Sequence, residues 1–266
     1  MNLKKELYVF RKTFSFWRNL RKKNDFLDWQ MHYAPHLQVY KNCHLGEDCF
    51  ILGNGPSLNK VDLELLNDHY IFGTNKIYKI FDKVDLHLSY HLSVNPPMIE
   101  QSRDVLEKGI GCPSFLSYSA SKDVIADKMH ILRFYTKGAP WIFTGDLLHP
   151  ITEGYTVTSV ALQLAYFMGF KRVFLLGVDH NYIQNGKPNS IQQVNGIDPN
   201  HFIADYVTGG QDWYLADLEA SEISYKQALY AYKKDNREIF DCTIGGKLTI
   251  FPKLELSEAL KIMKQK

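Results

Sequence analysis

The sequence lacks the patterns that define several large classes of protein. Its four cysteines, Cys43, Cys49, Cys112 and Cys242, form no CxxC pair and no cluster with histidine, which argues against a zinc site and a disulfide framework. No run approaches the roughly 18 to 20 apolar residues that a membrane-spanning helix needs, and the N-terminus has no signal-peptide pattern. We therefore expect free thiols and a cytoplasmic protein.

Several motifs that mark common classes of enzyme are also missing. The sequence contains no GxGxxG dinucleotide fingerprint, no GxxxxGK[ST] phosphate loop, no HExxH, no GxSxG elbow and no DxD pair. We expect neither a metal site nor a resident cofactor.

Charge is concentrated at the N-terminal end of the chain. Residues 1–23 carry eight lysines and arginines against one glutamate, so this segment is +7, and because the whole chain is +2 the other residues sum to −5. The acidic body disfavours nucleic-acid binding. Apolar side chains in the basic segment recur four and three residues apart, which predicts one stripe of a helix: Leu3, Leu7, Phe10, Phe14 and Trp17.

This basic helix has two interpretations. It could lie at the inner face of the cytoplasmic membrane as a peripheral anchor on anionic lipid, with Phe10, Phe14, Trp17 and Arg18 toward the membrane. Alternatively, it could pack its stripe on the domain or on a second subunit, as in a homo-oligomer. We interpret residues 1–30 as a basic amphipathic arm and residues 31–266 as the catalytic domain.

The body alternates short apolar runs with helical patterns, which is typical of an α/β fold with a Rossmann-like parallel sheet flanked by helices. We expect strands over residues 48–52, 70–73, 85–90, 114–116, 129–134, 172–176 and 238–242. Helical patterns cover residues 61–67, 158–168 and 217–234, and a last helix starts at Ser257. Residues 183–216 are rich in Asn, Gln, Gly and Pro without a period, and a loop of this length predicts a lid.

Two candidate ligand contacts follow the first two expected strands, at the sheet edge where open α/β sheets bind ligands. The first is the turn over residues 53–57, in which Gly53, Asn54 and Gly55 would let backbone N–H groups approach an anion. Ser57 could donate to a phosphate or cap the next helix, and a plain turn is the alternative. Asn75 follows the second strand, where its amide could bind a base or a sugar hydroxyl.

Further candidates surround the clearest helix and the lid. Thr156 and Thr158 precede or begin that helix and could cap it or face an anion. Gly177, Asp179 and Tyr182 leave the strand over 172–176 together. We expect Asp179 and Tyr182 to be catalytic, and the alternative for Asp179 is that it holds neighbouring loops. His201 lies in the expected lid, and its ordinary pKa of ~6.5 suits a general base.

Taken together, several motifs resemble a known bacterial family. They are FILGNGPSL at 50–58, FGTN at 72–75, GYTVTSVALQLAY at 154–166 and VFLLGVDHNY at 173–182. In this order they resemble the bacterial family once called domain of unknown function 115, which is similar in fold to the sialyltransferases of glycosyltransferase family 42, a variant of the GT-A architecture. Another branch of the family contains archaeal 6-hydroxymethylpterin diphosphokinases.

The resemblance implies a site for a CMP-activated nonulosonic or related acidic sugar, used in surface polysaccharide or flagellin glycosylation. It implies that Asn54 and Asn75 hold the nucleotide, that Thr156 to Thr158 lie near its ribose and phosphate, and that His201 is the base. Tyr182 would bind the leaving phosphate. A second nucleotide-binding asparagine of the sialyltransferases would fall near Tyr90 and His91, where this sequence departs from the pattern.

Three functions remain open from the sequence. The first is a metal-independent, inverting glycosyltransferase that moves a sugar from a CMP-activated donor to a glycan or lipid-linked glycan. The second is a Mg²⁺-dependent pterin diphosphokinase, in which Asp179 would help hold the metal. The third is a non-catalytic scaffold of a polysaccharide assembly complex that binds partners through residues 1–23.

Overall fold

A computed structural model describes residues 22–138, 142–193 and 196–264. The predictions for Phe10, Phe14, Trp17 and Arg18 lie outside the described residues and stay predictions. From residue 22 to 32 the chain is helical, and Trp29 is fully buried, with its indole N–H donating to the Arg133 carbonyl at 2.9 Å. The end of the predicted arm therefore packs on the body. None of the helices in the described residues is long and apolar enough to cross a membrane.

The centre of the molecule is a seven-stranded sheet in the order β11-β8-β1-β2-β3-β4-β5, with every neighbouring pair parallel. Its strands are β1 (Asp48–Leu52), β2 (Tyr70–Thr74), β3 (Tyr90–Ser93), β4 (Ser114–Ser117), β5 (Ile131–Phe134), β8 (Arg172–Leu176) and β11 (Glu238–Asp241). Two small pairs lie outside it: β6 (Thr136–Lys137) with β7 (Ile151–Thr152), and β9 (Ile191–Gln193) with β10 (Asp212–Tyr214). The predicted α/β class with a parallel sheet is confirmed.

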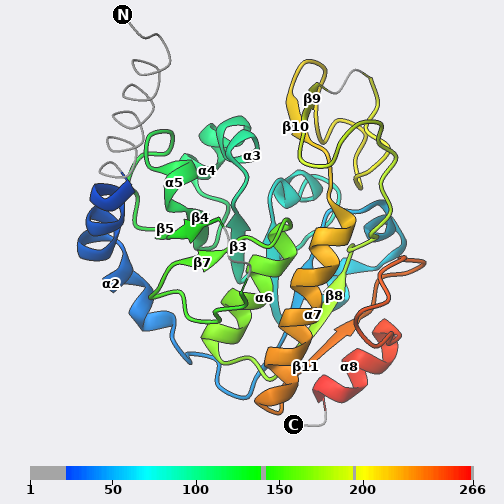
Figure 1. The fold of residues 1–266 in the computed structure, drawn as a ribbon. Helices are drawn as coiled ribbons and strands as arrows, with labels where there is room; N and C mark the ends of the chain where they lie inside the picture. Colours follow the sequence, from blue (N-terminus) through cyan, green and yellow to red (C-terminus); the bar gives the residue numbers. More distant parts are fainter. Residues whose placement is uncertain (1–21, 139–141, 194–195, 265–266) are drawn as a thin grey trace, which may run out of the picture.

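Helices cover both faces of the sheet (Figure 1). The α-helices are α2 (Ala34–Leu37), α3 (Pro96–Gln101), α4 (Arg103–Lys108), α5 (Tyr118–Ser121), α6 (Val157–Met168), α7 (Leu218–Lys234) and α8 (Leu256–Lys264). Short 3-10 helices are η1 (Gln38–Tyr40), η2 (Pro56–Lys60), η3 (Leu63–Leu66) and η4 (Ile77–Ile80). Helices α6 and α7 pack on one face, whereas α8 and the 3-10 helices η2 to η4 pack on the other.

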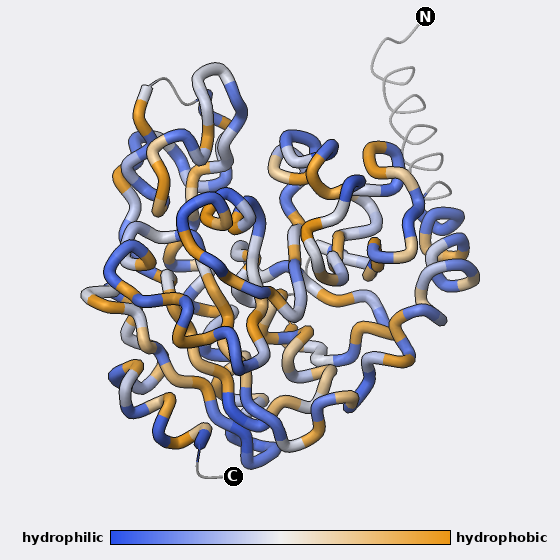
Figure 2. Tube along the Cα trace, turned by 180° about the vertical axis from the view of Figure 1, so that it is seen from behind, coloured by the Kyte–Doolittle hydropathy of each residue, from blue (hydrophilic) through white to orange (hydrophobic). Residues whose placement is uncertain are grey.

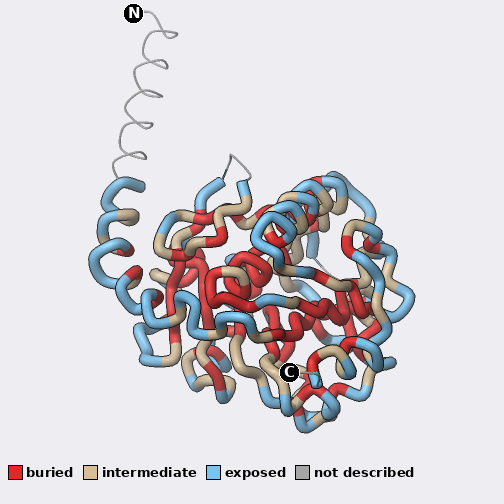
Figure 3. The backbone as a smooth tube through the Cα atoms, turned by 90° about the horizontal axis from the view of Figure 1, so that it is seen from below, coloured by how far each residue is buried: buried red, intermediate tan, exposed pale blue. Residues whose placement is uncertain are grey.

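The strands follow from their apolar runs, because the side chains of a strand alternate between the two faces of the sheet. In β1, Cys49 and Ile51 belong to the core under α6 and α7, whereas Phe50 and Leu52 belong to the opposite core. Strand β8 alternates in the same way. Figure 2 shows apolar residues along these central strands, and Figure 3 shows that they are buried between the helical layers.

Two of the expected elements differ from the structure. The strand expected at 85–90 is found later, as β3, and pairs Phe72 with Tyr90. The side chain of Asn67 explains the shift, because it donates to the Asp85 carbonyl at 2.6 Å and accepts from the His87 N–H at 2.9 Å, taking backbone groups that a ladder would use. The helical pattern at 61–67 forms only the 3-10 turn η3.

The order of the strands creates a point where the chain reverses direction across the sheet. From β1 it proceeds through β2 to β5 on one side and returns to β8 on the other side of β1. The carboxyl ends of β1 and β8 therefore diverge at a topological switch point, where open α/β sheets bind ligands. Residues 183–193 and 196–216 lie over this edge and include the β9–β10 pair (Figure 1).

Candidate functional site

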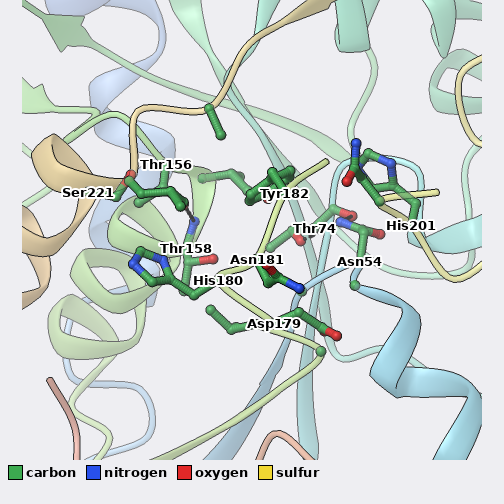
Figure 4. A pocket seen from close by; sticks show the side chains of 18 of the residues that line it. Asn54, Thr74, Thr156, Thr158, Asp179, His180, Asn181, Tyr182, His201 and Ser221 are labelled. Carbon is green, nitrogen blue, oxygen red and sulfur yellow. Dashed lines mark hydrogen bonds between the residues drawn. The ribbon is translucent and has the colours of Figure 1, made fainter. Parts of the chain in front are cut away.

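A pocket lies at the switch point, between the turns that follow β1, β2 and β8, the start of α6, and the segment over residues 183–216. Most of the predicted site residues line it: Gly53, Asn54, Gly55, Asn75, Thr156, Thr158, Gly177, Asp179, Tyr182 and His201. Figure 4 shows Thr156, Thr158 and His180 toward one end, His201 and Asn54 toward the other, and Tyr182 between them. The cavity measures ≈ 90 Å³.

The glycines of the turn after β1 allow it to pack against the turn after β8. A Cβ on Gly53 would lie 2.3 Å from the Gly177 carbonyl oxygen, and one on Gly55 would lie 1.9 Å from Asp179 Oδ2. The N–H groups of Gly53 and Gly55 donate to the carbonyls of Leu176 and Gly177, at 2.8 and 2.9 Å. These two amides serve contact between loops, so the sequence-based assignment of their N–H groups to an anion does not describe this structure.

Asp179 holds the same turn through its carboxylate. Its Oδ2 accepts from the Ser57 hydroxyl at 2.6 Å, and its Oδ1 accepts from the Ser57 N–H at 3.2 Å. Ser57 is buried and does not line the pocket. The geometry matches the alternative in which Asp179 positions loops, and its catalytic role stays a prediction.

Asn54 presents a buried oxygen that has no donor among the described residues. Its amide nitrogen donates to the Thr74 carbonyl and hydroxyl, both at 3.0 Å, and that hydroxyl donates to the Leu52 carbonyl at 2.9 Å. Because the Thr74 carbonyl can only accept, these contacts fix which end of the amide is nitrogen. Asn54 Oδ1 is therefore the atom left unpaired, and a buried acceptor without a donor calls for a ligand or a water.

Asn75 is held in a left-handed conformation, with φ of 50°, by three neighbours. Its N–H donates to the Leu92 carbonyl at 2.8 Å, its side-chain oxygen accepts from the Ser93 hydroxyl at 3.0 Å, and its carbonyl lies 2.7 Å from His91 Nε2. Complete burial lowers the pKa of His91 to about 4, so the ring is neutral and Nε2 donates. His91 stands near the place where the sialyltransferases have their second nucleotide-binding asparagine. Here it holds the backbone of Asn75 instead.

The N-terminus of α6 faces the opposite end of the pocket. Thr156 is the N-cap, and its hydroxyl accepts from the Thr158 N–H at 3.3 Å and lies 3.3 Å from the Tyr225 hydroxyl. Gly154 and Tyr155 adopt positive φ angles of 64° and 62° just before the helix. This turn exposes the positive end of the helix dipole to the pocket, which favours an anion there.

His201 forms a buried pair with a carboxylate that the sequence did not single out. Its Nδ1 lies 2.6 Å from Asp198 Oδ2, and both side chains are almost completely buried. The imidazole stacks on Tyr206 with ring centroids 3.9 Å apart, and the indole of Trp213 meets it edge-on at 4.8 Å. An ionised carboxylate can only accept, so in a neutral imidazole paired with it Nδ1 carries the hydrogen and Nε2 is left with its lone pair.

The segment around His201 is tied to the turns that follow β1 and β2. The Phe202 N–H donates to the Asn54 carbonyl at 2.9 Å, and the side chain of Asn59 donates to the Phe202 carbonyl at 2.8 Å. The Lys76 ammonium, which is buried, donates to the Tyr206 carbonyl at 2.9 Å and to Gln211 at 3.1 Å. Burial lowers the pKa of Lys76 to about 8. Residues 201–211 therefore close over the edge of the sheet.

A second imidazole lines the pocket. His180 Nε2 lies 3.2 Å from Glu222 Oε1 on α7, and the residue has a positive φ of 52°. Beside it, burial raises the pKa of the Tyr182 phenol, which therefore keeps its proton and can donate. The residues that follow Asp179 were visible as a His-Asn-Tyr run in the sequence, but the carboxylate that faces His180 comes from a helix about forty residues later, and no local signal indicates it.

Solved structures and one family pattern are similar to this chain. No curated protein matches the sequence. Among solved structures, the MAf glycosyltransferase from Magnetospirillum magneticum AMB-1 matches over 80% of this chain and 34% of its own, with a TM-score of 0.50 and 14% identity. A mammalian sialyltransferase in complex with Gal-beta-1-3GalNAc-ortho-nitrophenol matches over 76% of this chain and 70% of its own, with a TM-score of 0.37 and 11% identity.

The chain thus spans about a third of the length of the MAf glycosyltransferase, and the likeness shows a shared fold. The sequence itself matches a family pattern over residues 19–185. This range includes the turns after β1, β2 and β8 and the start of α6. Because the match covers more than half of the 266 residues, the protein belongs to the family described as 6-hydroxymethylpterin diphosphokinase MptE-like.

Proposed function

We propose that the protein transfers a sugar from a CMP-activated donor to a hydroxyl group of a glycan. The charge of the pocket carries this proposal, since none of the described residues that line it is a lysine or an arginine. A CMP-sugar brings a single phosphate with one negative charge, and an acidic sugar adds its carboxylate at a separate position, whereas a nucleoside diphosphate or triphosphate gathers several negative charges in one chain of phosphates. The N-terminus of α6 offers backbone donors and about half a positive charge, which suits a single phosphate.

The opposite end of the pocket suits the polar groups of a nucleoside or sugar. Asn54 Oδ1 is buried and has no donor in the described part of the chain, and Asn75 lines the same pocket from the turn after β2. A ligand N–H or O–H placed against Asn54 Oδ1 would remove the cost of the unpaired acceptor. The resemblance to family 42 sialyltransferases makes a nonulosonic or related acidic sugar the first donor to test.

His201 would act as the general base. The acceptor hydroxyl gives its proton to Nε2, the acceptor oxygen forms a bond to the anomeric carbon, and the bond from that carbon to the phosphate oxygen breaks with inversion. Asp198 stabilises the imidazolium that forms, through the 2.6 Å contact with Nδ1. CMP departs with the electron pair, and the protonated phenol of Tyr182 together with the start of α6 would receive its phosphate.

The fold shared with the MAf glycosyltransferase supports a glycosyl transfer. The ≈ 90 Å³ cavity is smaller than the roughly 300 to 1,000 Å³ of most ligand pockets, so residues 201–211 would open for the donor to enter. Closure afterwards would exclude water and limit hydrolysis of the donor.

The family description favours a second candidate, diphosphate transfer from ATP to a hydroxymethyl pterin. Aromatic side chains in the pocket, among them Tyr155 and Trp213, could stack a pteridine ring. Such a donor would bring Mg²⁺ to compensate its charge, and Asp179 would have to release Ser57 in order to bind it.

Thermal unfolding with added nucleotides separates the two candidates. The protein is measured with CMP, CDP, UDP, GDP and ATP, each with Mg²⁺ and with EDTA, because a ligand present at a hundred times its Kd stabilises the native state by about 2.7 kcal/mol. We expect CMP to raise the midpoint in EDTA. A shift with ATP and Mg²⁺ alone would instead support the diphosphokinase, and no shift with any nucleotide would refute both.

The base is tested by comparing the two imidazoles of the pocket. We expect His201→Gln to lower CMP release from CMP-N-acetylneuraminic acid in the presence of acceptor by at least a hundredfold, within the ~10²–10⁴ that a general base contributes. His180→Gln is the matched control, because His180 also pairs with a carboxylate in the pocket. Loss of activity in the His180 variant alone would assign the base to His180.

A further inference from the structure

A second cavity of ≈ 190 Å³ lies beside the first and is lined by Asp198, the carboxylate that pairs with His201. It shares Asn200 and Trp213 with the main pocket. A molecule in this cavity would therefore contact the indole that packs edge-on against the His201 ring and would lie next to the carboxylate that orients that ring.

The β9–β10 pair builds one wall of the second cavity. Gln192 stands directly opposite Trp213 in the antiparallel register, and directly opposite residues project their side chains from the same face of a sheet. The indole of Trp213 and the carboxamide of Gln192 thus lie side by side. The neighbouring pair, Ile191 and Tyr214, projects from the other face.

Gln184 and Asn200, two other amide side chains of the lining, form hydrogen bonds that hold the walls of the cavity. Gln184 exchanges hydrogen bonds with the backbone of Ala216, at 2.8 Å in both directions. Asn200 accepts from the Ile183 N–H at 2.7 Å and donates to the Ile183 carbonyl at 3.0 Å. Gln184 thus ties the start of the segment to its end, and Asn200 ties the start to its middle. Gln192 and Gln193 are the other two carboxamides of the lining, and Gln192 is the one that shares a face with Trp213.

The chemistry of the lining selects the class of ligand. Asp198 is the one ionisable side chain among the described residues that line the cavity, and no lysine or arginine accompanies it. A carboxamide both donates and accepts, which matches the hydroxyl groups of a sugar, and an aromatic face packs against the apolar face of a sugar ring. A carboxylate or phosphate would meet only the negative charge of Asp198.

We propose that the second cavity is the acceptor subsite and binds the terminal residue of a neutral saccharide, with Trp213 as the stacking face and Gln192 as the polar contact. The assignment of this ligand as the acceptor rests on the proposed glycosyl transfer. His201 lines the main pocket and not the second cavity, so a hydroxyl of the bound sugar would reach Nε2 past Asn200 and Trp213, which line both cavities, whereas the donor would fill the main pocket between His201 and α6.

Binding of simple glycosides tests the subsite without requiring turnover. The protein, saturated with CMP, is titrated with the methyl glycosides of glucose, galactose, mannose, N-acetylglucosamine and N-acetylgalactosamine, and binding is followed by saturation-transfer NMR. Methyl glucuronide serves as the anionic counterpart of methyl glucoside. We expect at least one neutral glycoside to bind and the glucuronide to bind at least tenfold more weakly than the glucoside.

Variants of the β9–β10 pair locate the binding. We expect Gln192→Ala to weaken the bound glycoside about tenfold, the effect of losing one good hydrogen bond, and Trp213→Ala to abolish its binding. Gln192 is exposed, so its variant should fold even if the Trp213 variant does not. Ile191→Ala is the matched control, because it alters the opposite face of the same strand and should leave the affinity unchanged.

Three results would overturn the subsite: no neutral glycoside binds, the affinity is indifferent to Gln192, or the glucuronide binds as tightly as the glucoside. The thermal shift with CMP is measured on the same samples. If CMP gives no shift but a glycoside still binds through Gln192, the donor proposal fails while the saccharide site stands. If CMP binds and Gln192 has no effect, the saccharide site alone fails.

Discussion

Replacing Gly55 with alanine should break the junction between the two turns that form the floor of the pocket. Gly55 has φ of −69° and ψ of 159°, a conformation that alanine adopts without strain, so any effect comes from the added methyl group. That group would lie 1.9 Å from Asp179 Oδ2 and 2.9 Å from the Gly177 carbonyl oxygen. To reach an ordinary contact, the carboxylate would have to retreat by about 1.5 Å.

This retreat would stretch the 2.6 Å contact between Asp179 and Ser57 beyond hydrogen-bonding distance. Each hydrogen bond to a charged group contributes ~1.5–3 kcal/mol, so loss of the pair of bonds, partly replaced by water, should cost about 3 kcal/mol. With an unfolding entropy of ~2.1 cal/mol/K per residue, the midpoint of a chain of this length should fall by about 5 °C.

The assay is unfolding by heat and by urea, followed by circular dichroism, for wild type, Gly55→Ala and Gly209→Ala. Gly209 is the matched control, because a Cβ there would have no neighbour within 4 Å and its φ is not in the left-handed region. We expect the control to stay within about 0.5 kcal/mol of wild type. A Gly55→Ala protein as stable as the control would show that the two turns do not depend on their close approach.

Two further predictions concern the contributions of Asp179 and His91 to the free energy of unfolding. If Asp179 acts by holding the turn, the stability lost in Asp179→Asn should largely disappear in a Ser57→Ala background. A double-mutant cycle measured by urea unfolding should give a coupling free energy of ~1.5–3 kcal/mol. Additive losses would show that Asp179 does not act through Ser57. The buried His91 has its pKa lowered to about 4 from the 6.5 of a free imidazole, so the unfolded chain binds its proton first as the pH falls. The contribution of His91 is therefore fully present above pH 6.5 and is lost between pH 6.5 and 4, by about 3 kcal/mol in total. Urea unfolding at pH 7, 5.5 and 4.5 should show a steeper loss for wild type than for His91→Gln, and parallel curves would contradict the assignment.

The fold could be predicted where burial on both faces of the sheet dictates the residue type. The run at 172–176 and the helix that ends before Gly169 are found as predicted, because a continuous apolar stretch and a glycine cap leave few alternatives. The strand near residue 90 could not be placed in the same way. Its position depends on Asn67, a residue from another segment that takes the backbone groups of residues 85–87.

The same distinction, between residues placed by local sequence and residues placed by contacts with other segments, applies to the site. Asn54, Asn75 and Thr156 follow strands or begin a helix, so the expected parallel sheet already places them at one edge. Asp198 lies three residues before His201, but no motif in the sequence indicates that the two side chains pair. Glu222 on α7 and Gln192 on β9 could not be found, because they meet their partners only in the folded chain. The second cavity depends on the register of β9 with β10, which no period in the sequence indicates.

The hydrogen bond from the Phe202 amide to the Asn54 carbonyl makes the separation of the lid from the turn after β1 measurable. This single N–H belongs to the segment that carries the proposed base, and its acceptor belongs to the turn that meets the proposed nucleotide. The amide can exchange its hydrogen for deuterium only when the two segments separate, so its exchange rate reports the free energy of that separation rather than of global unfolding. A ligand that bridges both segments should slow this amide while leaving the amides of the sheet unaffected, whatever the ligand turns out to be.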